Sequence, residues 1–260
     1  MKAKVARKVL RDEDYPERDG RPMAETDLHR DLMLDLIATL QHYFAHRRRV
    51  YVSGNLLVFY EEGNGQKHVS PDVFVVRGVP KHPRRNYLIW KEGKPPEFVI
   101  ELTSISTRIE DLETTYNLYR EIGVREYFLF DPRDEYLDPR LMGFRRLRGR
   151  FRPIKPVGGR FPSRVTGLHL VEQGQQLRLY DPQTGEILPT PAERAAREEE
   201  RARQAAELAR QEAERARQEA ERARQEAAAR ALAEERARLA EAELERLRLE
   251  LEQLRRRNGR

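Results

Sequence analysis

Two acidic residues lie inside short apolar runs, where an ionised side chain is costly to bury. Asp72 lies in the run SPDVFVV, and Glu101 lies in FVIELT. Runs of this length, rich in Val, Ile and Phe, predict buried β-strands. Because hard divalent cations take oxygen ligands, two such acids on neighbouring strands predict a divalent-metal site. The alternative is that each acid lies at a strand end, solvated or paired with an arginine such as Arg108.

The residues after Glu101 predict the elements that position it. Alternation along the strand places Val99, Glu101 and Thr103 on one face. A helix is expected over residues 109–122, closed by Gly123, and VREYFLFD predicts the next strand. A strand, helix, strand order implies a right-handed crossover and at least one parallel pair, which is typical of a mixed α/β sheet.

The wider sequence carries a more specific pattern. Pro71-Asp72, followed by Glu101-Leu102-Thr103, fits the PD-(D/E)XK nuclease pattern with threonine in place of lysine. Together with PEFVIELTSISTR, Asp111 and LYREIGVREYFLFDP, it resembles the Uma-two family of restriction endonucleases. The resemblance covers residues 22–190.

The resemblance implies a restriction-endonuclease-like α/β core whose metal ligands are Asp72 and Glu101. Family members commonly carry a lysine four residues past the acid at 111, and Thr115 occupies that place here. Thr103 and Thr115 therefore stand where the pattern and the family would supply a lysine. The candidate catalytic residues are Asp72, Glu101, Thr103 and Thr115, with Glu25, Arg108 and Asp111 as accessory candidates.

Three functions remain open on this reading. The first is a Mg²⁺- or Mn²⁺-dependent endonuclease that hydrolyses nucleic acid, expected to be DNA, and cleaves weakly because the usual lysine is missing. The second is a degenerate nuclease-fold domain that binds nucleic acid or protein without cutting. The third is a scaffold in which the C-terminal tail performs the function.

A helix is expected to begin near Glu25, with Thr26 or Asp27 as its cap. Its leucines recur at helical spacing and predict an apolar stripe packed on the sheet. His29, near the start of this helix, is interpreted as a packed or hydrogen-bonded residue.

The segment from 78 to 96 is rich in proline and positive charge, as a loop along a nucleic-acid backbone would be. Tyr87 and Trp90 offer flat faces to bases, or else belong to a segment that covers the core. The basic residues that would form this phosphate path are Lys81, Arg84, Arg85, Lys91 and Lys94.

Composition limits the class of protein, its partner and its compartment. The 260 residues can bury one sizeable core, and the charged fraction of 36% indicates that part of the chain is not globular. The net charge is +6, and most of this excess lies before the nearly neutral tail, which suits a polyanionic partner. There are no cysteines, so disulfides and thiolate sites are excluded. No apolar run approaches the roughly 20 residues of a membrane helix. We expect a cytoplasmic protein without a membrane segment.

Three regions follow from these patterns. Residues 1–21 are expected to form a flexible arm, and 22–190 a nuclease-like domain whose part from 135 to 188 is rich in β-hairpins. Residues 191–260 are expected to form a helical coiled-coil tail. A seven-residue repeat, as in ELARQEA and ERARQEA, runs from Glu207 to Ala227 with Ala at coiled-coil core spacing, and after a register change near Arg230 the stripe resumes with Ala and then Leu. We expect a homo-oligomer formed through this tail. The alternative is a lone helix held by Glu–Arg pairs.

Overall fold

The computed structural model describes residues 10–18, 26–103 and 110–258, without the side chains of 110–112 and 254–258. The chain divides into two compact units, Met1–Arg194 and Ala195–Arg260, called the head and the tail below. The accessory candidates Glu25 and Arg108 lie outside the described residues, as does the side chain of Asp111.

A six-stranded sheet forms the centre of the head. Only β6 and β7 run parallel within it, and the other neighbouring pairs are antiparallel. The predicted mixed α/β sheet, with its parallel pair after the Glu101 strand, is thereby confirmed. The strand order is β1 (Val50–Ser53), β4 (Val73–Arg77), β6 (Phe98–Leu102), β7 (Glu126–Phe130), β8 (Leu141–Leu147) and β9 (Arg150–Pro153).

Helix α1 (Asp27–Tyr43) covers one face of this sheet. Its first turn is capped by Thr26, one of the two predicted caps, whose hydroxyl accepts the backbone N–H of His29 at 3.3 Å. Leu32, Leu36 and Leu40 are buried against alternate residues of β4 and β6, because side chains of a strand point to opposite faces in turn.

The opposite face is covered by a segment that crosses from β6 to β7. The expected single helix is divided into a π-helical turn, η2 (Glu110–Thr115), and a short α-helix, α3 (Tyr116–Ile122). Gly123 ends α3 in the left-handed conformation at φ 99°, as its position after the apolar stripe predicts. Tyr119 packs there with Val99 of β6 and Tyr127 of β7.

A separate sheet of three strands packs on the central sheet, where Tyr87 of the small sheet stacks on Tyr51 of β1. The turn at 61–66 closes an antiparallel hairpin of β2 (Val58–Phe59) and β3 (His68–Val69), and β5 (Tyr87–Leu88) joins β2 in parallel. Tyr87 is fully buried, so this segment covers the core rather than presenting its ring to a base. A short helix, α2 (Ile89–Glu92), follows β5.

Residues 10–18 also pack on the head. After the 3-10 turn η1 (Asp12–Asp14), Tyr15 is buried, with its ring 4.9 Å from Phe59 and 5.2 Å from Trp90 between centroids. Its hydroxyl accepts the backbone N–H of Gly63 at 2.6 Å. This part of the expected N-terminal arm is therefore held in place by burial of an aromatic ring.

The β-rich extension forms a second antiparallel sheet. Leu170, Leu177 and Leu179 of this sheet belong to the same apolar core as α1. The extension therefore completes the burial of α1 rather than forming a separate core. Its strands are β10 (Phe161–Pro162), β11 (His169–Gln173), β12 (Gln176–Asp181) and β13 (Glu186–Ile187).

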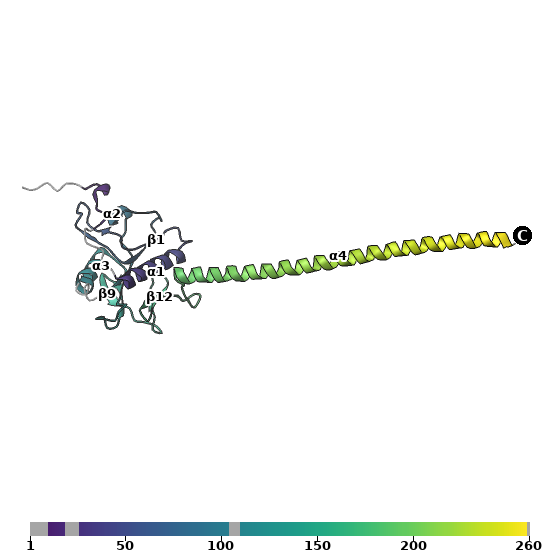
Figure 1. The fold of residues 1–260 in the computed structure, drawn as a ribbon. Helices are drawn as coiled ribbons and strands as arrows, with labels where there is room; N and C mark the ends of the chain where they lie inside the picture. Colours follow the sequence, from purple (N-terminus) through teal and green to yellow (C-terminus); the bar gives the residue numbers. More distant parts are fainter. Residues whose placement is uncertain (1–9, 19–25, 104–109, 259–260) are drawn as a thin grey trace, which may run out of the picture. The chain divides into compact units, whose positions relative to one another are not determined.

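A single helix, α4 (Pro191–Asn258), runs through the rest of the chain (Figure 1). Pro191 suits the first helical position, where no N–H partner is needed. Thr190 and Glu193 form a capping box, in which each side chain accepts the other residue's backbone N–H. Among the described residues, no helix has the length and hydropathy needed to cross a membrane.

Candidate active site

Asp72 and Glu101 meet at the ends of two adjacent antiparallel strands. The register pairs Val73 with Ile100, which places Asp72, immediately before β4, opposite Glu101 of β6. Oε2 of Glu101 accepts the backbone N–H of Asp72 at 3.1 Å, and Oδ2 of Asp72 accepts that of Leu102 at 2.7 Å. The two carboxylates therefore lie beside each other at the end of this strand pair, each hydrogen-bonded to the backbone of the other's strand.

Two side chains from other elements contact these acids. Nε2 of His29, in the first turn of α1, lies 3.1 Å from Oδ1 of Asp72. The hydroxyl of Tyr119, in α3, donates to Oε1 of Glu101. The sequence alone did not connect either residue with the acids, because the contact depends on how α1 and α3 dock on opposite faces of the sheet.

Burial differs between the two acids. Glu101 is 7% exposed, whereas the side chain of Asp72 is 15% exposed. Burial, and then the negative charge of Glu101, raise the pKa of Tyr119 well above its usual value. Tyr119 therefore keeps its proton at neutral pH and remains a hydrogen-bond donor to the Glu101 carboxylate.

The chain after β1 passes unusually close to Asp72. A Cβ atom on Gly54 would lie 1.9 Å from the backbone carbonyl oxygen of Asp72, so only glycine fits at this position. The next residue, Asn55, donates its backbone N–H to the carbonyl of Pro71 at 2.8 Å. These contacts fix the backbone that presents the Asp72 side chain.

The two threonines that replace the expected lysines have different surroundings. Thr103 is buried, and its hydroxyl is paired with the hydroxyl of Tyr136. Thr115 is buried in the last position of η2, one helical turn before Tyr119. Residues four apart on a helix lie on the same side, so Thr115 and Tyr119 both face the sheet.

The described residues include no group of three or more His, Cys, Asp or Glu side chains arranged to hold a metal ion. Asp72 and Glu101 supply two carboxylates, which is the ligand chemistry that Mg²⁺ and Mn²⁺ favour. The two other expected acids, Glu25 and Asp111, have side chains outside the described part of the chain. The two carboxylates that the structure describes are ligands of the kind that a hard divalent cation binds.

The basic residues of the 78–96 segment are engaged within the head. The side chain of Arg84 is only 3% exposed and donates to both carboxylate oxygens of Glu92, so its charge is already balanced. The remaining contacts join Arg85 to Glu17, Lys91 to Asp12 at 2.7 Å, and Lys94 to the carbonyl of Arg77 at 2.6 Å.

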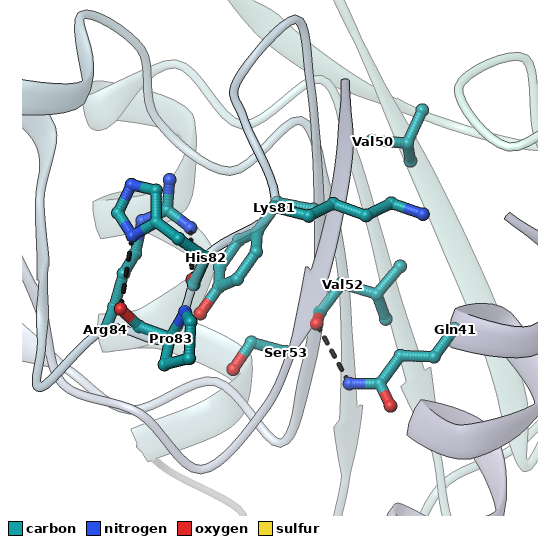
Figure 2. A pocket seen from close by; sticks show the side chains of 9 residues that line it. Gln41, Val50, Val52, Ser53, Lys81, His82, Pro83 and Arg84 are labelled. Atoms are coloured by element: carbon teal, nitrogen blue, oxygen red, sulfur yellow. Dashed lines mark hydrogen bonds between the residues drawn. The ribbon is translucent and has the colours of Figure 1, made fainter. Parts of the chain in front are cut away.

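A hollow of about 530 Å³ lies along β1, beside this basic segment (Figure 2). Figure 2 shows Lys81 extended across β1 and the Gln41 amide bonded to the carbonyl of Val52, at 3.2 Å. Lys81 also donates to the carbonyls of Phe44 and Ala45, just after α1. Neither Asp72 nor Glu101 lines this hollow, which is therefore separate from the acid pair.

No curated protein matches the chain. Among solved structures, the chain is similar to a putative nuclease belonging to DUF820 from Anabaena variabilis ATCC 29413, at 15% identity and a TM-score of 0.43. That match covers 58% of this chain and 80% of the other. The family Uma2, described as "Putative restriction endonuclease", matches residues 9–193. Since this match spans most of the chain, the protein belongs to the Uma2 family.

Proposed function

We propose that the head is a metal-dependent endonuclease that hydrolyses phosphodiester bonds of DNA. The observation that carries this proposal is the placement of Asp72 and Glu101 opposite each other on adjacent strands. Burying two carboxylates together is costly unless a cation or donors compensate their charge. Membership of a family described as restriction endonucleases supports nucleic acid as the substrate.

Asp72 and Glu101 would hold the cation, which is Mg²⁺ or Mn²⁺. When bound, such an ion supplies Lewis-acid polarisation of the phosphate and a more acidic water. Tyr119 holds the Glu101 carboxylate through its hydroxyl, and His29 holds that of Asp72 through Nε2. Both are positioning residues, since they orient groups that ligate the metal.

Cleavage by this site is expected to be slow. A lysine near the second acid would offset charge that develops in the transition state, and a hydroxyl brings no charge. The hydroxyl of Thr103 is already paired with Tyr136, and Thr115 is a neutral residue on the buried side of η2. Loss of one such charge typically costs a few kcal/mol, or orders of magnitude in rate.

The same observation supports a second candidate function. A head that retains Asp72 and Glu101 but lacks the lysine could bind metal and nucleic acid without hydrolysing it. Basic residues such as Lys81, beside the hollow along β1, would then serve for binding alone. Binding of a DNA duplex with no cleavage in Mn²⁺ would favour this candidate over the endonuclease.

Titration with Mn²⁺ followed by calorimetry tests the metal site. The wild-type protein should bind Mn²⁺, and Asp72→Asn should weaken binding at least tenfold, because one ligand is lost. Asp31→Asn is the matched control, since Asp31 is an exposed acid of α1 two residues from His29. Equal affinity of the wild-type protein and Asp72→Asn for Mn²⁺ would overturn the proposed site.

We also propose that the protein self-associates through α4. The tail carries a seven-residue repeat with Ala or Leu at core spacing, which is the pattern of coiled-coil helices. Because alanine buries little area, the leucines toward the C-terminal end contribute most to this association.

A further inference from the structure

The tail exposes a row of large apolar side chains. Every described side chain from Ala195 to residue 253 is exposed. The leucines at 244, 247 and 251 are each more than half exposed, and they recur at the spacing of coiled-coil core positions. A row of this kind is the surface against which another helix packs in a coiled coil.

Charged residues flank the core positions in a fixed order. In a heptad abcdefg, a and d form the core, and e and g lie on either side of it. The alanines at 213, 220 and 227 occupy a, and those at 209, 216 and 223 occupy d. The g positions are then Glu212, Glu219 and Glu226, and the e positions are Arg210, Arg217 and Arg224.

This order of charges distinguishes parallel from antiparallel pairing. In a parallel, in-register pair, each g residue faces the e residue five positions later on the partner helix. Glu212 would face Arg217, and Glu219 would face Arg224, on both sides of the pair. In an antiparallel pair, g faces g and e faces e, which would bring Glu against Glu and Arg against Arg in these heptads.

The leucine-containing segment follows the same rule. After a register change near Arg230, Leu244 occupies a and Leu247 occupies d. Glu243 is then at g and Arg248 at e, five residues apart and of opposite sign. The complementary order is therefore kept where the core residues change from alanine to leucine.

Hydrogen bonds within α4 leave these flanking residues available. Glu207 accepts from the amide of Gln211, and Glu214 accepts from that of Gln218, both at 3.1 Å. These pairs join positions b and f, on the side away from the core. Along the part of α4 with described side chains, Glu219 and Arg224 form no hydrogen bond or ion pair with their own helix.

We propose that α4 pairs with α4 of a second copy of this chain as a parallel, in-register two-stranded coiled coil. The head precedes the tail in the sequence, so a parallel pair brings two heads to the same end of the coiled coil. If the proposed function of the head holds, one dimer carries two phosphodiester-cleaving sites, one for each strand of a duplex. The pairing itself does not depend on that activity.

Engineered cysteines test the direction of the pair in the full-length protein. The chain has no cysteine, so each introduced thiol is the only one present. Ala216→Cys places it at a d position, where a parallel, in-register partner brings the two Cα atoms within the roughly 7 Å that a disulfide spans. Gln218→Cys, at the outward f position, is the matched control.

Under mild oxidation, Ala216→Cys should form a covalent dimer in most molecules, and Gln218→Cys should form several-fold less. Light scattering should give twice the chain mass of 30.6 kDa for the wild-type protein at micromolar concentration. A monomeric mass, or equal cross-linking of the two variants, would overturn the proposal.

Charge reversal gives a second test with its own rescue. Glu219→Arg places arginine opposite Arg224 of a parallel partner and should raise the dimer dissociation constant severalfold. Adding Arg224→Glu to the same chain restores opposite charges and should return the constant to that of the wild-type protein. Failure of the double variant to recover, with Glu219→Arg alone impaired, would contradict the predicted g-to-e contact.

Discussion

Asp72 and Glu101 are each hydrogen-bonded to the other's strand: each carboxylate accepts a backbone N–H from the strand that carries the other acid. Asp72 gives its N–H to Glu101, and Leu102, next to Glu101, gives its N–H to Asp72. This reciprocal arrangement fixes the two carboxylates beside each other at the end of the β4–β6 pair. Hydrogen bonds from backbone N–H groups hold the carboxylate oxygens in fixed positions, as oriented metal ligands require.

Removing the hydroxyl of Tyr119 should weaken metal binding without unfolding the head. Tyr119→Phe keeps the buried ring but deprives Glu101 of a donor, and loss of such a contact typically costs about 10- to 100-fold in metal affinity. Calorimetric titration with Mn²⁺ measures the effect. Tyr116→Phe, at a partly buried ring of the same helix, is the control, and an equal loss in both variants would assign the effect to packing.

Replacing His29 should act through Asp72. His29→Leu removes the contact with Oδ1 of Asp72 and should lower the affinity for Mn²⁺ about 10-fold or more. His29→Gln, which keeps a donor, should recover part of the loss. Identical affinities of the Leu and Gln variants would argue against a positioning role through this hydrogen bond.

A lysine introduced at Thr115 should raise the cleavage rate. Thr115 lies one turn before Tyr119 on the sheet-facing side, so Thr115→Lys brings a positive charge toward Glu101. Thr114→Lys adds the same charge at an exposed neighbouring position and should leave the rate unchanged. Rates are measured on linear duplex DNA with Mn²⁺; an equal increase in both variants would indicate a general charge effect.

The Arg84–Glu92 pair should stabilise the head above acidic pH. The hydrogen bond from Arg84 lowers the pKa of Glu92 below its usual value, despite partial burial. A carboxyl whose pKa is depressed on folding contributes stability above its unfolded pKa, and that contribution is lost as pH falls through the folded pKa. Stability should therefore decline as pH falls below about 4.5.

Truncating Arg84 should remove this contribution and leave Glu92 unpaired in a buried setting. Arg84→Ala is expected to cost about 3 kcal/mol in the free energy of unfolding at pH 7. Arg85→Ala is the adjacent control: Arg85 is 67% exposed in its pair with Glu17, so its loss should cost less than about 1 kcal/mol. Urea unfolding followed by circular dichroism measures both, and equal costs would show that burial of the pair is unimportant.

Local sequence patterns predicted the elements that carry the acids. The cap at Thr26, the strand containing Glu101, the glycine closure at Gly123 and the parallel pair after it all follow from short-range signals. Such signals work because capping, alternation and turn chemistry depend on neighbouring residues in the chain. The break of the expected helix into η2 and α3 has no comparable local signal.

Contacts between distant segments could not be predicted in the same way. His29 and Asp72 are 43 positions apart, and their contact depends on the angle at which α1 packs on the sheet. The basic loop was expected to face nucleic acid. The side chain of Arg84 is instead buried: it is paired with Glu92, and its guanidinium lies 4.0 Å from the centre of the Tyr51 ring. The sequence shows that a residue is basic, but the residues that pack around it in the fold decide whether its side chain can contact nucleic acid.

The central claim is that Asp72 and Glu101 hold the metal that cleavage needs. It is tested by measuring cleavage of duplex DNA, with Mg²⁺ or Mn²⁺, by four proteins: the wild type, Asp72→Asn, Glu101→Gln and the double variant. The wild-type protein should cleave slowly, and only with a divalent cation present. Either single substitution should reduce cleavage to the level without metal, because each removes one of the two carboxylate ligands. Circular dichroism must show that the variants are folded. Robust cleavage that survives loss of both acids would contradict the account and place the active site elsewhere in the chain.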